Sequence, residues 1–400
     1  MCRVRPLPAG FPPSDLQESV TTVSNPLSAA ELGASASPAE IERLRRILAE
    51  AVARGATDIH IRAGDAVNVR VGGELVPLDS GVLTALSLYE MTMHILATSA
   101  SAPDIDTVHD YSGPWSAPGI GRFRLSLLKQ RSSFMIVLRV IPDVLPTFES
   151  LGLPLPLTSI SLSEFGLILV AGTPGSGRSS TVAAFVNQLN SKSARRRHIV
   201  SVEQAIRYLH RNNSCAVTQR EVGIDTVSYL SGVQAAMEQD ADVIVIGDLN
   251  SPELVEIAVR AAEQGRLVIA KIRAADVTSA VRSLLANFPS DRQDSARLQL
   301  SELLRGVVAQ RLLPRADSRG RVAAAEVLLM TPLVRDVLTD AGRLGELRNT
   351  LSEGRAQYGT QTFDQHLADR VIAGHVSFEV AVTLATNSLD FELQLRGLRR

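Results

Sequence analysis

The pattern of hydrophobic and polar positions changes along the chain and divides it into regions. Segments 57–64, 67–78 and 121–142 alternate apolar and polar residues with a period of two, which is typical of strands in an antiparallel sheet. From residue 161, short and almost wholly apolar segments alternate with helical stretches. This second pattern indicates a mainly parallel sheet covered by helices on both faces, so the sequence predicts an α/β protein.

The first predicted domain, residues 38–142, is a small α+β domain. Ser37 is a favourable N-cap for its first helix, which we expect to end at Gly55. The Gly-Gly pair at 72–73 predicts a tight hairpin turn between two of the strands. A second helix is expected over residues 85–100.

The larger predicted domain is the parallel-sheet core, residues 161–315, which a proline-containing linker at 143–160 joins to the first domain. Beyond the last core strand the strand signal fades. Segment 295–314 is expected to begin a mostly helical C-terminal region, which continues over 316–400 and contains one strand candidate, 320–330. The strands expected in the core are 166–172, 197–203, 241–248 and 266–272.

Composition supports an ordinary globular protein of two or three domains. The chain has 400 residues, of which 45% are hydrophobic and 21% charged. Its formal net charge of −1 provides no overall field that would attract nucleic acid, so we expect no nucleic-acid partner. The two cysteines lack the spacing of a disulfide framework or a metal site.

No segment predicts membrane insertion or secretion. The longest apolar runs are far shorter than the ~20 residues that a membrane-spanning helix needs, which favours a cytosolic protein without a transmembrane segment. Residues 1–37 are rich in proline, serine and alanine and are expected to be a disordered leader. Of the 41 basic residues only three are lysine and the other 38 are arginine. This bias makes an arginine at a lysine position less surprising in this chain.

The segment VAGTPGSGRSSTV, residues 170–182, has nearly the form of a phosphate-binding loop. Glycines let backbone N–H groups converge on an anion, and the following helix adds the positive end of its dipole. The usual pattern is G-x-x-x-x-G-K-[ST]. Gly172, Gly177 and Ser179 fit it, but Arg178 replaces the lysine. A glycine-rich turn without a ligand is the alternative, and the strand before it and the helix after it argue against that alternative.

The order of these motifs resembles the secretion ATPases of type II secretion and type IV pili, the GspE/PilT-like family, and most closely the pilus-retraction type called PilT. The resemblance extends over about residues 40–390. It is carried by ATDIHIRAGDAVNVRVGGELVPL, by the phosphate-loop segment, and by TQREVGIDT followed by DADVIVIGD. It implies a PAS-like N-terminal domain followed by a RecA-like P-loop domain.

The resemblance also implies cofactors and partners. ATP would bind on the loop, with Mg²⁺ on the Ser179 hydroxyl. The chain would form a hexameric ring with itself or with a paralogous ATPase. That ring would lie at the cytoplasmic face of a pilus or secretion inner-membrane platform, so that the protein is cytoplasmic and peripheral to the inner membrane through its partners. The nucleotide-binding residues expected in the loop are Gly172, Thr173, Pro174, Gly175, Ser176, Gly177, Arg178, Ser179 and Ser180.

Four departures from the family pattern concern catalysis. Arg178 keeps the charge of the lysine in a larger planar head, so nucleotide binding is expected to be weakened or altered. Asp248 stands where the family has glutamate and is one methylene shorter, unless it is simply a polar residue at a strand end. In SVEQAIRY, Glu203 remains as a carboxylate to orient water or a metal, but Gln204 and Arg207 replace acidic residues of the family.

The fourth departure is the loss of histidines. The sensor histidines of the family align with Arg266 and Arg273, and a guanidinium cannot replace the neutral hydrogen bonding of an imidazole. In the family, arginines of the N-terminal domain act on the phosphates across the cleft. The positions that match are Arg122, Arg124, Arg131 and Arg139, for which solvated strand residues are the alternative.

Together these features predict a chain that keeps a nucleotide cradle and has lost much of its chemistry. Glu203 and Asp248 are the candidate catalytic residues, and ATP hydrolysis is expected to be weakened or lost. An accessory or regulatory subunit of a pilus or secretion ring is the predicted role. Two alternatives stay open: an active hexameric ATPase motor for retraction or secretion, and a structural subunit that no longer binds nucleotide.

Overall fold

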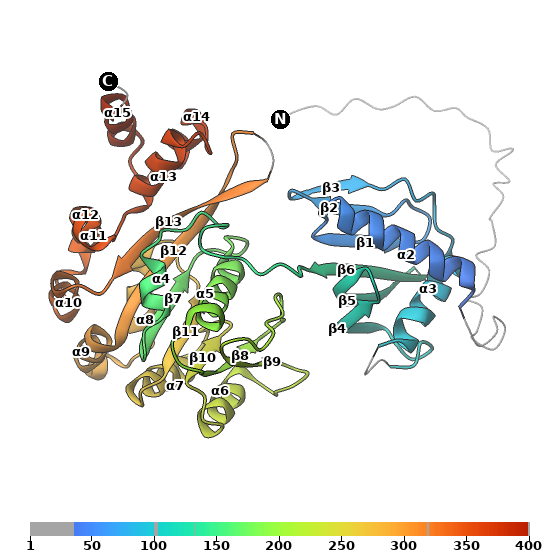
Figure 1. The fold of residues 1–400 in the computed structure, drawn as a ribbon, viewed down its shortest axis with the longest axis horizontal. Helices are drawn as coiled ribbons and strands as arrows, with labels where there is room; N and C mark the ends of the chain where they lie inside the picture. Colours follow the sequence, from blue (N-terminus) through green and yellow to red (C-terminus); the bar gives the residue numbers. More distant parts are fainter. Residues whose placement is uncertain (1–35, 100–102, 132, 318–319, 399–400) are drawn as a thin grey trace, which may run out of the picture.

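The chain forms two domains, an antiparallel one near its N-terminus and a larger one with a mostly parallel sheet (Figure 1). The computed structural model describes residues 36–99, 103–131, 133–317 and 320–398, so the predicted leader lies almost wholly outside the described residues. Within these ranges the predicted fold class is confirmed: an α+β domain, an α/β core and a helical C-terminal region.

The N-terminal domain is a six-stranded antiparallel sheet in the order β3-β2-β1-β6-β5-β4, with two helices. Gly72 and Gly73 join β2 to β3 with φ of 62° and 101°, the left-handed values that a tight primed hairpin turn requires. Strand β4 was not expected from the sequence. The elements are α2 (Pro38–Ala53), β1 (Asp58–Arg62), β2 (Asn68–Val71), β3 (Glu74–Pro77), α3 (Ala85–Ala97), β4 (Asp110–Ala117), β5 (Gly121–Gln130) and β6 (Ser133–Ile141).

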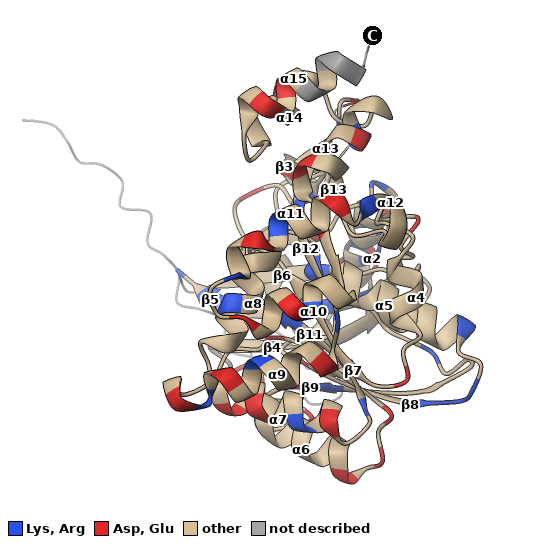
Figure 2. Ribbon diagram, turned by 90° about the vertical axis from the view of Figure 1, so that its left-hand side faces the viewer, with Lys and Arg blue, Asp and Glu red and all other residues tan. Residues whose placement is uncertain are grey.

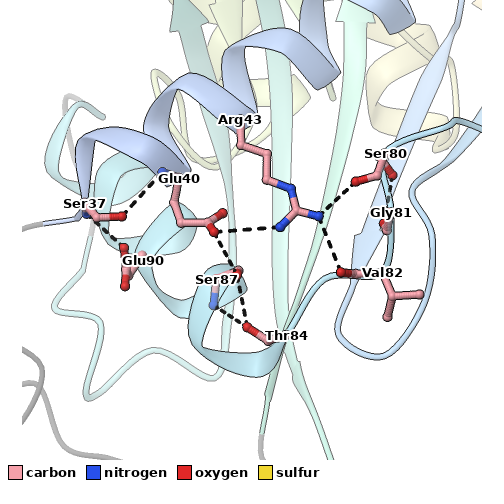
Figure 3. Close-up of polar contacts among 9 residues, drawn as sticks. All are labelled: Ser37, Glu40, Arg43, Ser80, Gly81, Val82, Thr84, Ser87 and Glu90. Carbon is pink, nitrogen blue, oxygen red and sulfur yellow. Dashed lines mark hydrogen bonds and ion pairs between the residues drawn. The ribbon is translucent and has the colours of Figure 1, made fainter.

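Polar contacts fix the two helices of this domain to each other (Figure 3). The Ser37 hydroxyl caps α2 by accepting from the Glu40 backbone N–H at 3.4 Å. The Glu40 carboxylate in turn accepts from Ser87 Oγ on α3 at 3.0 Å. Arg43, on the next turn of α2, donates to the Ser80 carbonyl at 2.8 Å and thereby holds the loop that leads into α3.

The C-terminal domain contains a seven-stranded sheet in the order β13-β12-β7-β11-β10-β8-β9, in which all neighbouring pairs are parallel except β12 with β13. Its strands are β7 (Gly166–Ala171), β8 (His198–Glu203), β9 (Ala216–Glu221), β10 (Val243–Ile246), β11 (Leu267–Ile272), β12 (Leu304–Pro314) and β13 (Arg321–Leu329). Its helices are α4 (Leu157–Ser161), α5 (Arg178–Lys192), α6 (Tyr229–Glu238), α7 (Pro252–Glu263), α8 (Val277–Leu285), η1 (Ser290–Arg292), α9 (Gln293–Leu303), α10 (Pro332–Thr339), η2 (Leu344–Glu346), α11 (Leu347–Glu353), α12 (Arg355–Tyr358), α13 (Phe363–Ile372), α14 (Phe378–Leu384) and α15 (Ser388–Leu398).

Both faces of this sheet are covered, as the apolar strands predicted. On β11, Val268 and Ala270 pack in the core formed with α6 to α11, while Leu267 and Ile269 pack in the core formed with α4 and α5. Successive residues of a strand point to opposite faces, so each strand contributes to both cores. The four strands predicted in the core are confirmed.

The prediction of a helical tail from residue 295 is wrong for part of that segment. Residues 304–314 form β12, which pairs in parallel with β7 and antiparallel with β13. The sheet therefore continues past residue 315, where the sequence placed the end of the core. A short apolar run fits a buried strand and a buried helix equally well by periodicity, and only its place in the sheet decides between them.

The outer edge of β13 is closed by side chains and backbone from the C-terminal region. Gln361 exchanges backbone hydrogen bonds with Val327 at 2.9 and 3.0 Å, and its side chain donates to the Ala325 carbonyl. The buried His366 Nδ1 accepts the Ala325 N–H at 2.9 Å. An open strand edge invites pairing with another chain, so these contacts protect it.

Basic and acidic residues are interspersed along the helices, and neither sign is confined to one part of the ribbon (Figure 2). This mixture is in keeping with the net charge of −1. None of the helices in the described ranges has the length and apolar character needed to cross a membrane.

The edge contact of His366 makes stability depend on pH. Burial lowers the pKa of His366 to about 3 in the folded chain, while an unfolded histidine titrates near 6.5. The unfolded state therefore binds more protons between these values, and stability falls as pH drops below about 6.5. We expect this residue to cost about 1.4 kcal/mol of unfolding free energy between pH 7.5 and 5.5. Urea titrations at both pH values measure this change in the unfolding free energy.

His366→Asn is the matched variant, since its amide oxygen can accept the same N–H without titrating. The difference in stability between wild type and variant should therefore change by that amount between the two pH values. An equal pH dependence in both proteins would show that His366 is protonated in the folded state.

Candidate functional site

The glycine-rich loop connects β7 to α5, and its three glycines have positive φ. Gly172, Gly175 and Gly177 have φ of 154°, 80° and 92°. A Cβ on Gly177 would lie 2.8 Å from Gln310 Nε2, and one on Gly172 would lie 2.9 Å from the Gln310 carbonyl oxygen. Only glycine fits these two positions without displacing β12.

Gln310 supports the loop from behind, and the sequence analysis missed it. Its Nε2 donates to the Ser176 carbonyl at 2.7 Å, and its Oε1 accepts from Thr181 Oγ1 at 2.5 Å. The side chain comes from β12 and is 2% exposed. An amide directly after the apolar run Val307–Ala309 was the available signal, but it was hidden because this segment was expected to be helical.

The open side of the loop suits an anion. Gly177 is the N-cap of α5 and provides no side-chain cap, so the first N–H groups of the helix are left for a ligand. A cavity of about 400 Å³ lies there, and its lining carries four cationic side chains and one carboxylate. A triphosphate fits this lining. The charged residues that line it are Arg178, Arg207, Lys271, Arg273 and Asp248.

Arg178 does not use its guanidinium on the loop. Its Nη1 donates to the Ile272 carbonyl at 2.9 Å and lies 3.8 Å from Asp248 Oδ1. Burial lowers the pKa of Arg178, and the Asp248 carboxylate opposes that shift. The side chain is thereby held at the ends of β10 and β11, within the lining of the cavity.

The Asp248 carboxylate is shared between two arginines. Arg273 donates to Asp248 Oδ2 from Nη2 at 3.0 Å and from Nε at 3.2 Å, while Arg178 faces the other oxygen. A water molecule would have to compete with both guanidinium groups for this carboxylate. Asp248 thus lies in the lining of the cavity with both of its carboxylate oxygens facing arginines.

Glu203 and Lys271 form a second charged group beneath the head of α5. Glu203, at the end of β8, accepts from Ser201 Oγ at 3.2 Å, and Lys271 Nζ donates to Ser179 Oγ at 3.2 Å. Burial raises the pKa of Glu203 and lowers the pKa of Lys271, and their mutual attraction opposes both shifts. The sequence analysis did not single out Lys271, although it is one of only three lysines.

These residues do not fit Mg²⁺ on Ser179. The hydroxyl expected to hold the metal already accepts from the Lys271 ammonium. A divalent cation on the same oxygen would lie close to that charge, where repulsion amounts to roughly 4 kcal/mol per unit of charge at about 4 Å in partly buried surroundings. Within the described residues, no group of three or more His, Cys, Asp or Glu is arranged to hold a metal ion.

The N-terminal arginines divide into two groups. Arg124 and Arg139 line a cavity of about 620 Å³ between the domains, which also reaches Ser179 and Ser180. Both are already paired, Arg124 with Glu221 of the other domain and Arg139 Nε with Asp58 Oδ1 at 2.8 Å. Arg122, which is exposed on β5, and Arg131, in the turn after β5, are not among the residues that line the cavity.

The two arginines at the histidine positions lie at opposite ends of β11. Arg273 follows the strand and binds Asp248, as described above. Arg266 precedes it and donates to the Met237 carbonyl at 2.9 Å, on the side of the sheet away from the loop. Two tyrosines that the sequence analysis did not consider complete the site. Tyr208 Oη lies 2.7 Å from Ser180 Oγ, and burial raises the pKa of Tyr229 to about 12.

Comparisons with known proteins identify the family and relatives of this chain. Residues 119–371 match the family described as Type II/IV secretion system protein. The chain is 35% identical over 357 residues to the type IV pilus ATPase PilU of Pseudomonas aeruginosa, covering 89% of this chain and 91% of PilU. It is 29% identical over 338 residues to the pilus retraction ATPase PilT of the same organism, covering 84% and 96%. A crystal structure of the pilus retraction motor PilT with bound ADP superposes with a TM-score of 0.76 at 30% identity, covering 87% of this chain and 98% of that one.

Replacing Gln310 tests the support of the loop. Gln310→Leu would leave the buried Ser176 carbonyl and the Thr181 hydroxyl without their partner, at about 1–3 kcal/mol for each group. We expect the unfolding free energy to fall by about 2–4 kcal/mol in urea titrations. Thr181→Val should cost less, and the double variant should cost less than the sum, because both changes remove one shared bond. A Gln310→Leu protein as stable as wild type would refute this role.

Proposed function

The chain belongs to the type II/IV secretion system protein family and is a PilT/PilU-like member of the type IV pilus ATPases, and we propose that it binds ATP and hydrolyses it slowly. In this proposal it acts as an accessory or regulatory subunit of a pilus or secretion ring. ATP is the nucleotide proposed, on the loop at 172–180, and the triphosphate is held by backbone N–H groups and by the cations of the site.

Retention of binding is supported by the loop itself. The glycines keep the backbone open, Gln310 fixes it from behind, and the head of α5 carries no side-chain cap. Four cationic side chains line the cavity against one carboxylate, Asp248. These features favour a bound polyanion, and they disfavour the alternative of a structural subunit without nucleotide.

Slow hydrolysis rests on one observation, the pairing of Asp248 with Arg178 and Arg273. In that pairing, two residues that depart from the family pattern, Arg178 and Asp248, interact with each other. Arg178, in the lysine position, lies 3.8 Å from Asp248, in the general-base position, so each has a charged protein partner that competes with the terminal phosphate or its attacking water. Loss of one preorganised group of this kind typically costs about 10²–10³ in rate, and two are affected here.

The ring and its location follow from the family rather than from contacts of this chain. We propose a ring with copies of itself or with a paralogous ATPase, at the cytoplasmic face of an inner-membrane platform. A subunit that binds ATP and turns it over slowly would hold its place in such a ring while neighbouring subunits cycle. The bond from Arg124 to Glu221 would then hold its own two domains together across the cavity.

An active ATPase motor is the second candidate, and one observation favours it. Arg124 and Arg139 lie in the cavity that reaches Ser179, which is where family arginines would approach the phosphates. If their partners Glu221 and Asp58 release them when nucleotide binds, they would be available for catalysis. Restoring the family residues would then change turnover little.

ATP binding and turnover of the wild-type chain should therefore be compared with a reverted variant, R178K/Q204E/D248E/R273H. We expect wild type to bind ATP but to turn over below about 0.01 s⁻¹, against the 1–10³ s⁻¹ of typical enzymes. The reverted variant should be at least about tenfold faster, because it restores directed charges and a free base. Calorimetry measures binding, and phosphate release measures turnover.

Arg54→Lys, on an exposed arginine at the end of α2, is the matched control for an arginine-to-lysine change and should leave turnover unchanged. Wild-type turnover at the rate of typical enzymes would support the motor instead. Absence of ATP binding would support the structural subunit.

A further inference from the structure

Lys271 has an unusual place among the three lysines of the chain. Lys129 and Lys192 are exposed near the ends of β5 and α5. Lys271 instead lies on β11, between the strand β7 that precedes the loop and the strand β10. Leu267 and Ile269 of β11 pack on the α5 face, so the alternation of the strand directs Lys271 to the same face. Its ammonium reaches the head of α5 and donates to Ser179 Oγ at 3.2 Å.

The carboxylate of Glu203 acts on the same ammonium electrostatically. Glu203 belongs to β8, where Ile199 packs on the α5 face, so alternation directs Ser201 and Glu203 to that face as well. Glu203 attracts Lys271 electrostatically and is held by Ser201. The ammonium therefore donates to the hydroxyl and is attracted by the carboxylate of the two residues that the sequence predicted around a metal.

We propose that Lys271 is the resident cation of the nucleotide site, which takes the place of Mg²⁺ between Ser179 and the terminal phosphates of ATP. The chain then binds ATP without a divalent metal. This inference rests on the proposed binding of ATP to the loop. It also explains how the site keeps a compact positive charge although Arg178 is directed to Ile272 and Asp248.

The chemistry of an ammonium suits this position. It is a compact charge with three donors, so it can bind Ser179 and Glu203 and still donate to a phosphate oxygen. A guanidinium is planar and larger, and Arg178 donates from Nη1 to the Ile272 carbonyl of β11. The other cations of the cavity, Arg207 and Arg273, add charge around the phosphates without contacting Ser179 in this arrangement.

A purely structural role is the competing explanation, in which Lys271 only neutralises the buried Glu203. The two explanations differ in what they predict for metal dependence. A structural lysine leaves ATP binding dependent on Mg²⁺, as in ordinary phosphate-loop sites. A resident cation makes binding independent of Mg²⁺, and its removal creates the dependence.

Calorimetric titration of the full-length chain with ATP, in EDTA and in excess Mg²⁺, distinguishes a structural lysine from a resident cation. We expect the wild-type Kd to differ by less than about threefold between the two buffers. Lys271→Thr should weaken binding in EDTA by about 10–150-fold, the usual worth of a hydrogen bond to a charged group. Mg²⁺ should then restore most of the affinity of the variant, since Ser179 and Glu203 are freed.

Lys192→Thr is the matched control, because Lys192 is exposed at the end of α5, and it should behave as wild type in both buffers. Wild-type binding only in Mg²⁺ would overturn the inference but leave the proposed function intact. Equal binding of wild type and Lys271→Thr in EDTA would also overturn it. No binding in either buffer would refute the proposed function itself. If Lys271→Thr does not fold, the wild-type titrations alone decide.

Discussion

The site depends on one electrostatic constraint: charges at the carboxyl ends of the parallel strands are partly removed from water and must be paired. Arg178, Asp248 and Arg273 pair with one another, while Lys271 donates to Ser179 and is attracted by Glu203. A buried charge without a partner is costly, so each substitution in this region changes the partners available to the rest. The charged side chains of the site thus form two connected groups.

Beneath these charges lies a rigid cradle. Gln310 ties the loop to β12 and to Thr181, and β12 is itself enclosed between β7 and β13. The C-terminal region covers the outer edge of β13. The strands next to the loop, β7 and β12, therefore each have a neighbouring strand on both sides, and the whole sheet supports the loop. A chain can therefore lose catalytic groups above the loop while the backbone geometry for binding phosphates persists, which is the combination that the proposed function requires.

The sequence predicted the fold class and the loop because both follow from local patterns. Periodicity identified the antiparallel and parallel strands, and glycine spacing located the loop. Residues 304–314 were misassigned because a short apolar run does not distinguish a strand from a helix. Gln310, Lys271 and the direction of Arg178 were out of reach, since each depends on which strands are neighbours. The strand order β12-β7-β11-β10 brings these residues together, and no single segment of the sequence predicts that order.

A crystal structure of the chain grown with ATP and Mn²⁺, recorded at a wavelength where manganese scatters anomalously, tests the central claim most directly. We predict phosphates on the loop at 172–180, Lys271 Nζ within hydrogen-bond distance of a terminal phosphate oxygen, and no manganese peak beside Ser179. A manganese ion bound to Ser179 Oγ, with Lys271 turned away from the phosphates, would contradict the claim.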